Sequence, residues 1–540
     1  MDNNVVIQFK RRGWIELSEK RGRKVKYAVL GTASLAVVLA SGSIFAAAQT
    51  TGGQATGLGQ TRSEFRLSSI FGSNSQAAVN YYTSNLPFSM PKMSVPQFPH
   101  RIYNIVDYGA VSGNSGLNTT AINNAIDTAA ATGGGIVEIP AGTWVTGPIV
   151  LKSNVNLHLE AGALVQFTPD HSQYPLIPDG SKYTVQSPIS ATNAQNVAIT
   201  GNGGFDGSGN TWAPVKQYKL SQKQWQGLIA SGGVVSSDGT MWWPSAQGAN
   251  AQTYMKTHSM TTKQDWENVK DYLRPNMVMF TKCENVLFDG PTFKNSPTHT
   301  VKIGNSTNVI IRNTKISNFW YTQNTDGFDI SADKNVLMYN DTINTGDDGI
   351  ALESSSSYYV DASHQAVQNI VIEDCHVYNA HSGFAIGSDT GGGVSNVYVH
   401  NDVYNGTVDG LRFKSSIGKG GLVHNIYING VQMQNIQDYA ITFNDSYVDN
   451  GADMSSLSSN NSPSWVPQFQ DIHIQNVNCD YALQALRMNG TPYAPIQNID
   501  FTNVNIRANK GPTSQYTNNI TNKNVIITTG ITELGLVLHQ

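Results

Sequence analysis

Cysteine is scarce in this chain of 540 residues, which has only three, Cys283, Cys375 and Cys479. Three isolated cysteines exclude a dense disulfide framework and any paired-cysteine zinc site. Charged residues make up only 13% of the chain, and the 50 glycines outnumber the 20 prolines. This composition excludes a disordered, collagen-like or charged helical protein and favours one built of strands and turns.

The beginning of the chain carries an excess of positive charge, whereas the rest carries an excess of negative charge. The first 48 residues carry eight Lys/Arg and three acids, and because the whole chain has a net charge of −4, the remainder carries −9. So acidic a body lacks the basic footprint that general nucleic-acid binding needs. We therefore expect no nucleic-acid partner.

The basic start is followed by an apolar stretch from Tyr27 to Ala40 and by the small residues Ala46–Ala48. This order predicts that residues 1–48 are a secretory signal, cleaved before Gln49. The alternative is an uncleaved membrane anchor, since about 20 apolar residues can span a bilayer. Both place the body outside the cytoplasm, secreted or periplasmic. Residues 49–100, rich in Gly, Ser, Thr, Gln and Pro, predict a linker or arm.

A short pattern returns throughout the rest of the chain: an Asn or Asp followed by alternating apolar residues. The copies begin at Asn154, Asn196, Asn285, Asn308, Asn335, Asn369, Asn396, Asn425, Asp471, Asn498 and Asn524. Most spacings allow two or three short strands with turns, which is one coil of a solenoid. We predict an all-β, right-handed, single-stranded parallel β-helix over residues 101–540. The repeated asparagines are expected to occupy left-handed turns and to bond along the stack, without a catalytic role.

Two segments depart from the repeat. Helical spacing of Ile122, Ala125, Ile126 and Ala129 predicts an N-terminal helix that covers the open end of the stack. Residues 212–275 contain five of the nine tryptophans and predict a large loop insertion folded against one side of the β-helix. Its tryptophans are either packing residues or platforms for sugar rings.

A group of acidic residues recurs at the coil spacing. Asp326 precedes Asp347 by 21 residues, and Asp348 precedes His381 by 33. Stacking predicts one shared face, with Gly346 and Gly349 allowing a bend that aims both adjacent aspartates into one cleft. Neighbouring carboxylates raise at least one pKa, which provides a general acid beside ionised groups that activate water.

Two cations continue the spacing, because Arg412 follows His381 by 31 residues and shares a strand face with Lys414. Cations beside paired acids predict a substrate that is itself a carboxylate, held by the cations while the acids attack its glycosidic bond. The alternative is a structural network that neutralises the aspartates.

Together these motifs resemble glycoside hydrolase family 28, the polygalacturonases, over about residues 100–530. The resemblance implies that Asp347 is the general acid and that Asp326 and Asp348 activate water, with inversion at the anomeric carbon. It also implies that His381 tunes the acid. The substrate-binding residues it implies are Asn324, Arg412, Lys414 and Tyr439.

Several positions depart from the usual family pattern, and Glu353, which stands where many members have Lys, leaves the exact uronate preference open. The implied function is hydrolysis of α-1,4 bonds between galacturonate residues of pectin, without cofactor or metal. The partner is the polysaccharide, the protein is a monomer, and a membrane is involved only if the leader stays uncleaved. The resemblance to exo-acting members, with the insertion closing one end of the groove, predicts attack from chain ends.

Two other classes remain open. A pectate lyase also uses a β-helix, with Ca²⁺ held by clustered acids and an Arg as base. A non-catalytic carbohydrate-binding β-helix is the third reading, but it has no reason to place His381 and two cations one coil from three acids. Absorbance of unsaturated products and sensitivity to EDTA separate the lyase from the hydrolase.

Overall fold

The computed structural model describes residues 6–10, 14–18, 24–28, 34–40, 43–49, 76–113, 116–355, 365–447 and 466–532. The chain divides into two compact units, Met1–Arg66 and Leu67–Gln540. The first contains the antiparallel strands β1 (Val6–Lys10), β2 (Trp14–Ser18) and β3 (Lys24–Ala28), and the antiparallel pair β4 (Ser34–Ala40) and β5 (Ser43–Gln49). Within the described ranges no helix is both long and apolar enough to cross a membrane. The expected cleavage before Gln49 remains a prediction.

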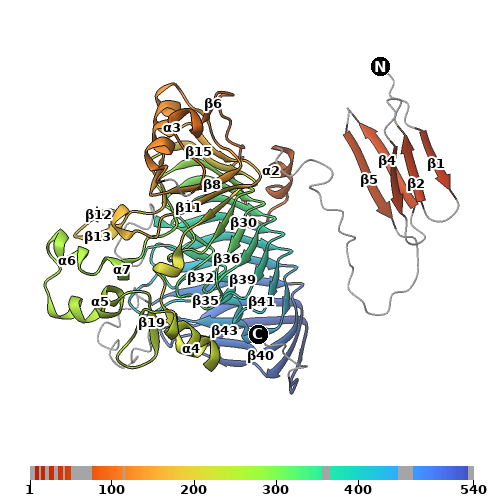
Figure 1. Cartoon of the computed structure of the whole chain (residues 1–540). Helices are drawn as coiled ribbons and strands as arrows, with labels where there is room; N and C mark the ends of the chain where they lie inside the picture. The colour runs from red at the N-terminus through yellow and green to blue at the C-terminus, as the bar shows by residue number, and fades with distance from the viewer. Residues whose placement is uncertain are drawn as a thin grey trace. The chain divides into compact units, whose positions relative to one another are not determined.

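The second unit is a stack of parallel strands that runs from α3 to the C-terminal end (Figure 1). Three sheets line the stack. The first contains β6 (Ile102–Asn104), β7 (Gly135–Ile139), β10 (Val155–Leu159), β15 (Gln195–Gly201), β21 (Glu284–Asp289), β24 (Thr307–Arg312), β27 (Lys334–Tyr339), β30 (Val367–Glu373), β33 (Val394–His400), β36 (Leu422–Asn429), β39 (Gln468–Gln475), β41 (Ile496–Lys510) and β43 (Thr517–Thr528).

The other two sheets follow the same order along the chain. The second contains β8 (Gly142–Thr146), β11 (Ala163–Phe167), β16 (Gly204–Asp206), β22 (Thr292–Lys294), β25 (Lys315–Ser317), β28 (Thr342–Asn344), β31 (His376–Tyr378), β34 (Val403–Asn405), β37 (Gln432–Gln434) and β40 (Asn478–Asn489). The third contains β9 (Ile149–Leu151), β14 (Ile189–Thr192), β20 (Val278–Thr281), β23 (Val301–Gly304), β26 (Phe328–Ser331), β29 (Ile350–Glu353), β32 (Ser382–Ile386), β35 (Asp409–Lys414), β38 (Ile436–Asn444), then the end of the long strand β40, and β42 (Thr513–Gln515). The predicted parallel β-helix is confirmed.

The core lies inside the three sheets, because alternate side chains of each strand point inward and meet their equivalents one coil away. Residues pair in parallel register, as Val336 pairs with Ile370. Inward aromatic rings stack along the axis, with 4.3 Å between the ring centroids of Phe413 and Phe443. All three cysteines are buried free thiols.

The repeated asparagines have the structural role expected of them. The residue that begins each copy of the pattern has a positive φ, for example 58° at Asn335 and 61° at Asn369. Asn335 Nδ2 donates to Asn308 Oδ1 at 3.1 Å, and Asn369 Nδ2 donates to Asn335 Oδ1 at 3.0 Å. Asn tolerates this left-handed backbone, and its amide both donates and accepts. The side chains therefore form a ladder that ties successive coils together.

The predicted capping helix is α3 (Thr119–Ala131), which buries Ile122, Ala125 and Ile126 against the first coils. The N-cap residue of this helix is Asn118, which makes no side-chain bond to the helix. Asn118 instead accepts from the Val111 backbone N–H and donates to the Val145 carbonyl, which ties the helix start to the stack.

Residues 76–100 belong to the segment that was expected to be a linker. They pack against the first sheet. Helix α2 (Gln76–Tyr82) places Tyr82 on Tyr339, with ring centroids 4.2 Å apart, and the Tyr82 hydroxyl donates to Asp374 at 2.8 Å. Met93 joins the same apolar cluster. This stretch is thus part of the folded body.

The insertion begins with β17 (Val215–Lys216) and includes α4 (Gln222–Ala230), β18 (Val234–Val235), β19 (Met241–Trp243), α5 (Ala246–Thr257), α6 (Lys263–Glu267) and α7 (Lys270–Leu273). Its five tryptophans, Trp212, Trp225, Trp242, Trp243 and Trp266, are between 1% and 8% exposed. The suggestion that they stack against a terminal sugar is therefore wrong. Trp212 and Trp266 share an apolar cluster with Tyr174, Leu176 and Val185 from the preceding coil, and Trp225 and Trp242 pack around Val215.

Candidate functional site

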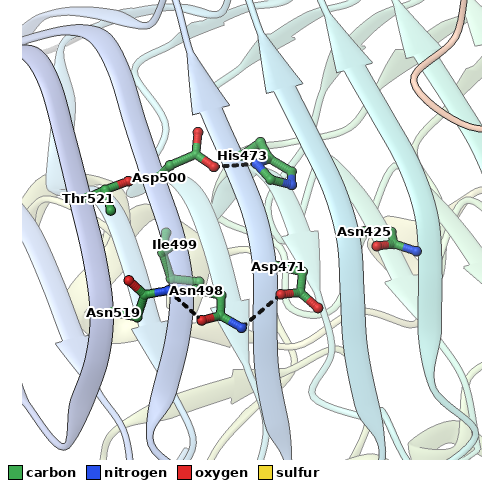
Figure 2. A pocket seen from close by; sticks show the side chains of 8 residues that line it. All are labelled: Asn425, Asp471, His473, Asn498, Ile499, Asp500, Asn519 and Thr521. Atoms are coloured by element: carbon green, nitrogen blue, oxygen red, sulfur yellow. Dashed lines mark hydrogen bonds and ion pairs between the residues drawn. The ribbon is translucent and has the colours of Figure 1, made fainter.

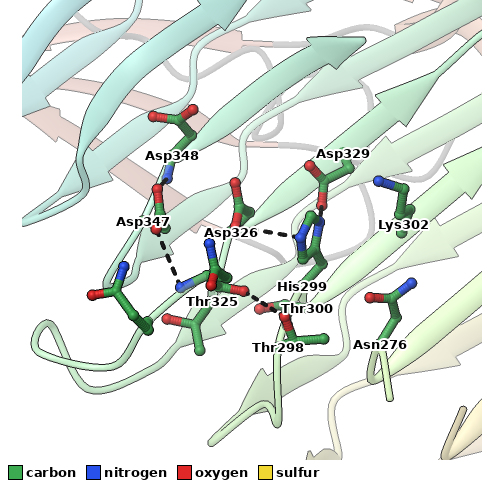
Figure 3. A network of polar contacts seen from close by, with 12 residues as sticks. Asn276, Thr298, His299, Thr300, Lys302, Thr325, Asp326, Asp329, Asp347 and Asp348 are labelled. Carbon is green, nitrogen blue, oxygen red and sulfur yellow. Dashed lines mark hydrogen bonds and ion pairs between the residues drawn. The ribbon is translucent and has the colours of Figure 1, made fainter. Parts of the chain in front are cut away.

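The acidic residues lie where the chain passes from the second sheet to the third. Asp326 precedes β26, and Asp347 and Asp348 precede β29 in the next coil. In Figure 3 the three carboxylates lie on one side of adjacent coils. The regular stack places them there, because β26 pairs with β29 in register.

The expected bend at the aspartate pair is present between β28 and β29. Two glycines permit it through close packing. A Cβ at Gly346 would lie 2.4 Å from the Thr322 carbonyl oxygen, and one at Gly349 would lie 2.5 Å from Val377 Cγ1. Any larger residue would push the coils apart, so the bend that aims Asp347 depends on both glycines.

Asp348 is nearly buried and surrounded by donors. Lys414 Nζ lies 2.8 Å from its Oδ2, Arg412 Nη1 lies 3.5 Å from Oδ1, and the Ser382 hydroxyl donates to Oδ1 at 2.7 Å. Burial opposes ionisation, but the charges of Lys414 and Arg412 outweigh it and hold the pKa of Asp348 at about 2. Asp348 is therefore ionised at neutral pH.

Asp347 faces a second set of donors. His381 Nδ1 lies 3.4 Å from Asp347 Oδ1, and the Asn324 backbone N–H donates to Oδ2 at 3.2 Å. Burial again opposes ionisation, but the hydrogen bond and charge of His381, followed by Lys219 and Lys414, hold the pKa of Asp347 well below its usual range.

Asp326 is the exception among the three. One of its oxygens has no hydrogen-bond partner among the described residues, and His299 Nε2 lies 3.9 Å away. Burial, reinforced by the charges of Asp347, Asp329 and Asp348, raises the pKa of Asp326 well above its usual value despite His299. Of the three carboxyls, Asp326 alone has a raised pKa and so holds a proton most strongly, whereas the family resemblance implied that the proton donor is Asp347.

His299 was missed by sequence reasoning, although it precedes Asp326 by 27 residues, a typical coil step. His299 Nδ1 lies 2.7 Å from Asp329 Oδ2, and burial is outweighed by Asp329 and Asp326, which raise the pKa of His299 to about 9. Figure 3 shows the imidazole between the two carboxylates. A positive charge therefore stands beside the protonated aspartate.

Glu353, the unusual acid, is part of the same wall of the third sheet. Lys302 Nζ lies 3.6 Å from Glu353 Oε2, across the intervening strand β26. Lys302 also faces Asp329, and these two acids outweigh burial to raise the pKa of the lysine. The extra negative charge of Glu353 is thus balanced within the protein.

The predicted substrate-binding residues divide into two groups. Asn324 is exposed at the rim, and its Oδ1 accepts from Arg274 Nη2 at 2.9 Å. Tyr439 lies beyond β35 and contacts none of the three acids; its hydroxyl accepts from Arg487 Nη1 at 3.3 Å, and the guanidinium carbon lies 4.2 Å from its ring centroid.

The aromatic residue that contacts Arg412 and Lys414 is Tyr447 and not Tyr439, and the sequence analysis did not identify it. The Tyr447 ring lies 5.4 Å from the guanidinium carbon of Arg412 and 5.3 Å from Lys414 Nζ. Tyr447 follows the turn after β38 rather than belonging to a repeated motif, so no spacing signalled it.

Among the described residues, two triplets of side chains have donor atoms close enough together to hold an ion: His299 with Asp326 and Asp329, and Asp347 with Asp348 and His381. Each triplet already has a lysine ammonium beside it, Lys302 at the first and Lys414 at the second. A resident cation disfavours a second one at the same carboxylates. The charges around the two triplets therefore favour acid–base chemistry by the side chains themselves over binding of a metal ion.

An open hollow on the outer face of the first sheet lies apart from these acids. It is lined by Asn425, Asp471, His473, Asn498, Ile499, Asp500, Asn519 and Thr521 (Figure 2). Its polar groups bond to one another: Asn498 Nδ2 donates to Asp471 Oδ1 at 3.0 Å, and His473 contacts Asp500. The hollow continues the ladder between coils and contains none of the acidic trio.

Comparison with known proteins connects this geometry to a family. The family described as "Glycosyl hydrolases family 28" matches residues 215–526. The chain is 28% identical over 391 residues to an exo-poly-alpha-D-galacturonosidase of Dickeya chrysanthemi, covering 70% of this chain and 62% of that protein. It is 26% identical over 418 residues to a probable polygalacturonase of Vitis vinifera, covering 74% of this chain and 73% of that one.

A solved structure has the same architecture. The hyperthermoactive exopolygalacturonase from Thermotoga maritima superposes with a TM-score of 0.63 at 26% identity, covering 81% of this chain and 94% of that one. The two chains therefore share the β-helix over most of its length.

Proposed function

The chain belongs to glycosyl hydrolases family 28, and we propose that it hydrolyses α-1,4 bonds between galacturonate residues of pectin. The observation that carries the proposal is the trio Asp326, Asp347 and Asp348, in which the pKa of Asp326 is raised and the other two are lowered, beside Arg412 and Lys414. One proton on a trio of carboxyls is what acid–base hydrolysis of a glycoside requires.

In the proposed reaction Asp347 donates its proton to the glycosidic oxygen as the bond to the anomeric carbon breaks. Asp326 and Asp348 take a proton from the attacking water, whose oxygen forms the new bond with inversion. The trio therefore has to move its proton from Asp326 to Asp347 before the reaction. A bound uronate drives this proton transfer, because its negative charge near Asp347 raises the pKa of Asp347.

Leaving-group dependence tests the roles. An aryl α-galacturonide with an acidic leaving group needs little protonation, so we expect Asp347→Asn to retain activity on it while losing activity on polygalacturonate. Asp348→Asn should lose both. If Asp326→Asn is the variant rescued by the activated substrate, Asp326 itself is the acid and the proposed transfer is wrong.

We propose attack from chain ends. The support is that the insertion contacts the cleft at the turn before β26, and that the relatives from Dickeya chrysanthemi and Thermotoga maritima are exo-acting by name. An exo enzyme releases reducing sugar from polygalacturonate with little loss of viscosity and gives one short product. A rapid fall in viscosity with a ladder of oligomers contradicts this mode.

The same assay separates hydrolysis from β-elimination. Hydrolysis produces no unsaturated sugar, so product absorbance near 235 nm should stay flat and activity should survive EDTA. Absorbance that grows with turnover and disappears with EDTA indicates a Ca²⁺-dependent lyase instead. Binding of polygalacturonate without any product indicates a carbohydrate-binding protein.

We further propose that the protein works outside the cytoplasm, secreted or periplasmic, as a monomer. The support is the basic and apolar order of residues 1–48 and a polymeric substrate that the body meets outside the cell. N-terminal sequencing of the exported protein tests this: a start at Gln49 indicates cleavage, and a retained Met1 in the membrane fraction indicates an anchor. Light scattering of the exported body gives the oligomeric state.

A further inference from the structure

The insertion brings a lysine to the catalytic cleft. Lys219 ends a short 3-10 turn (Gln217–Lys219) between β17 and α4, and its Nζ donates to the Gly346 carbonyl at 2.8 Å. Gly346 directly precedes Asp347, so the ammonium stands next to the residue to which we assign proton donation. Asp347 and Asp326 both act on the charge of Lys219, although burial lowers its pKa.

Both ends of the insertion are fixed to the rim of the cleft, which makes the position of Lys219 a built feature. At the start, Val215 forms an antiparallel bridge with Thr322. At the end, Arg274 donates through Nη1 to the Gln323 carbonyl at 2.7 Å and through Nη2 to Asn324. The segment 322–324 is thereby held from both sides, immediately before Asp326.

Cations therefore lie on two sides of the acidic trio, but they differ in the groups to which their N–H donors are bonded. Arg412 and Lys414 both contact Asp348, and Arg274 uses both amino groups of its guanidinium on the rim. Lys219 makes its hydrogen bond to one neutral carbonyl and, within the described residues, forms no ion pair within 4.0 Å. An ammonium has three N–H donors, so Lys219 keeps donors for a ligand.

The surroundings of Lys219 also suit a sugar ring. Tyr218, the neighbour of Lys219 in the chain, is 77% exposed, and its ring centroid lies 5.8 Å from the ammonium nitrogen of Lys216. On the neighbouring turn, Phe319 and Trp320 are 48% and 40% exposed. Exposed aromatic surface next to a cation binds an amphipathic, negatively charged sugar better than it binds a neutral polar one.

We propose that Lys219, with Tyr218 beside it, forms a binding subsite for the carboxylate of a second uronate, across the scissile bond from the sugar held by Arg412 and Lys414. The inference rests on the proposed galacturonan hydrolysis and adds a specificity-determining residue that the β-helix itself does not provide. The subsite lies beside Gly346, next to the turn 322–324 to which both ends of the insertion are fixed, and this fits the proposed attack from chain ends.

The test uses the full-length protein, the variants Lys219→Met and Lys219→Arg, and trigalacturonate either unmodified or methyl-esterified at one terminal sugar. Esterification removes the carboxylate charge and keeps the ring. We expect wild type to discriminate against the ester at one end, and Lys219→Met to lose this discrimination and to raise KM for the unmodified trimer about 10- to 100-fold, the usual value of a charged hydrogen bond. The value of kcat should change less than about threefold, and Lys219→Arg should keep most of the discrimination.

The matched control is Lys223→Met, which removes an exposed lysine from α4 in the same insertion. It should leave KM and the preference for the unesterified trimer unchanged. If Lys219→Met behaves like this control, or if it lowers kcat equally for the unmodified and the esterified trimer together with the melting temperature, Lys219 is only a structural tie and the inference is overturned.

Failure of the proposed function has a different signature. If wild type cleaves no galacturonan, the hydrolase proposal fails, and calorimetric titration of trigalacturonate into wild type and Lys219→Met still tests the subsite. A loss of affinity confined to the unesterified trimer supports it. Equal affinity of the two proteins for both trimers contradicts it.

Discussion

Two sets of aspartates are buried in this β-helix, and their surroundings are opposite. Asp333, Asp341 and Asp402 each accept a hydrogen bond from a backbone N–H one coil away, at Ser306, Thr314 and Cys375, between 2.6 and 2.8 Å. No described residue forms an ion pair with any of the three within 4.0 Å, and burial raises their pKa values well above the usual range. Asp347 and Asp348 are paired with cations, which lower their pKa values.

Burial of a carboxyl therefore does not by itself mark a functional site. In the first set each carboxyl is a polar link between coils with a raised pKa, and Asp341 Oδ2 has no hydrogen-bond partner among the described residues. In the second set each charge has several partners, and the balance among them changes when a charged ligand arrives. Asp326 combines features of both sets, because its pKa is raised like those of the scaffold acids and it lies beside Asp347 and Asp348, whose pKa values are lowered.

Removing charge in the cleft should cause the greatest loss of activity. Asp348→Asn should lower kcat on polygalacturonate by about 10²–10⁴, with the fold retained, because it removes an ionised group that prepares the water. The matched control Asp402→Asn should leave kcat within about threefold, since Asn keeps an acceptor for Cys375. Steady-state kinetics and circular dichroism measure both, and equal losses would erase the distinction between the two sets.

The second-largest effect on activity should come from removing the cations Arg412 and Lys414. Replacing both Arg412 and Lys414 with Ala should raise KM for polygalacturonate by about 10²-fold or more, because two charged hydrogen bonds to the substrate are lost. Asp348 should also be affected, because burial without its cations raises its pKa from about 2. The acid limb of the kcat/KM profile should therefore move to higher pH. An unchanged KM would assign the two cations to structure alone.

A weaker effect is expected at His299, which acts on Asp326 without touching the substrate. His299→Gln removes a positive charge 3.9 Å from Asp326 Oδ1, so the pKa of Asp326 should rise further and its proton should be harder to transfer. We expect kcat to fall about 10-fold, with the acid limb of its pH profile moved upward. His400→Gln is the control, because His400 pairs with Glu373 at 2.8 Å on the first sheet. Identical pH profiles for the two variants would exclude this positioning role.

The smallest expected effect concerns the free energy of unfolding and its dependence on pH. The folded pKa of Asp341 is raised, so its contribution is fully present below its unfolded pKa and is lost as pH rises through the folded value. For Asp348 the folded pKa is lowered, so its contribution is present above the unfolded value and is lost as pH falls toward about 2.

Asp341→Asn should therefore flatten the decline of stability between weakly acidic and neutral pH, by about 1 kcal/mol, since Asn is neutral throughout. Urea denaturation at pH 5 and pH 8 measures the difference. A decline as steep in the variant as in wild type would show that Asp341 is ionised in the folded protein.

The amino-acid sequence determined the repeat, and the repeat carried most of the cleft. One coil of a β-helix converts a sequence interval into a fixed step along the axis, so the intervals among Asp326, Asp347 and His381 were enough to predict that these residues are neighbours. Counting one coil of 27 residues back from Asp326 would have identified His299 in the same way. The asparagine ladder was predictable for the same reason, since its geometry repeats locally at every coil.

Tertiary structure decided what the repeat does not encode. The insertion follows no coil spacing, so only its folding shows that Lys219 reaches Gly346 and that the five tryptophans are buried. The place of the proton also needed the structure, because a pKa depends on burial and on every nearby charge in three dimensions. The sequence could place three acids together, but only the donors collected around Asp347 and Asp348, and missing around Asp326, decided which of them holds the proton.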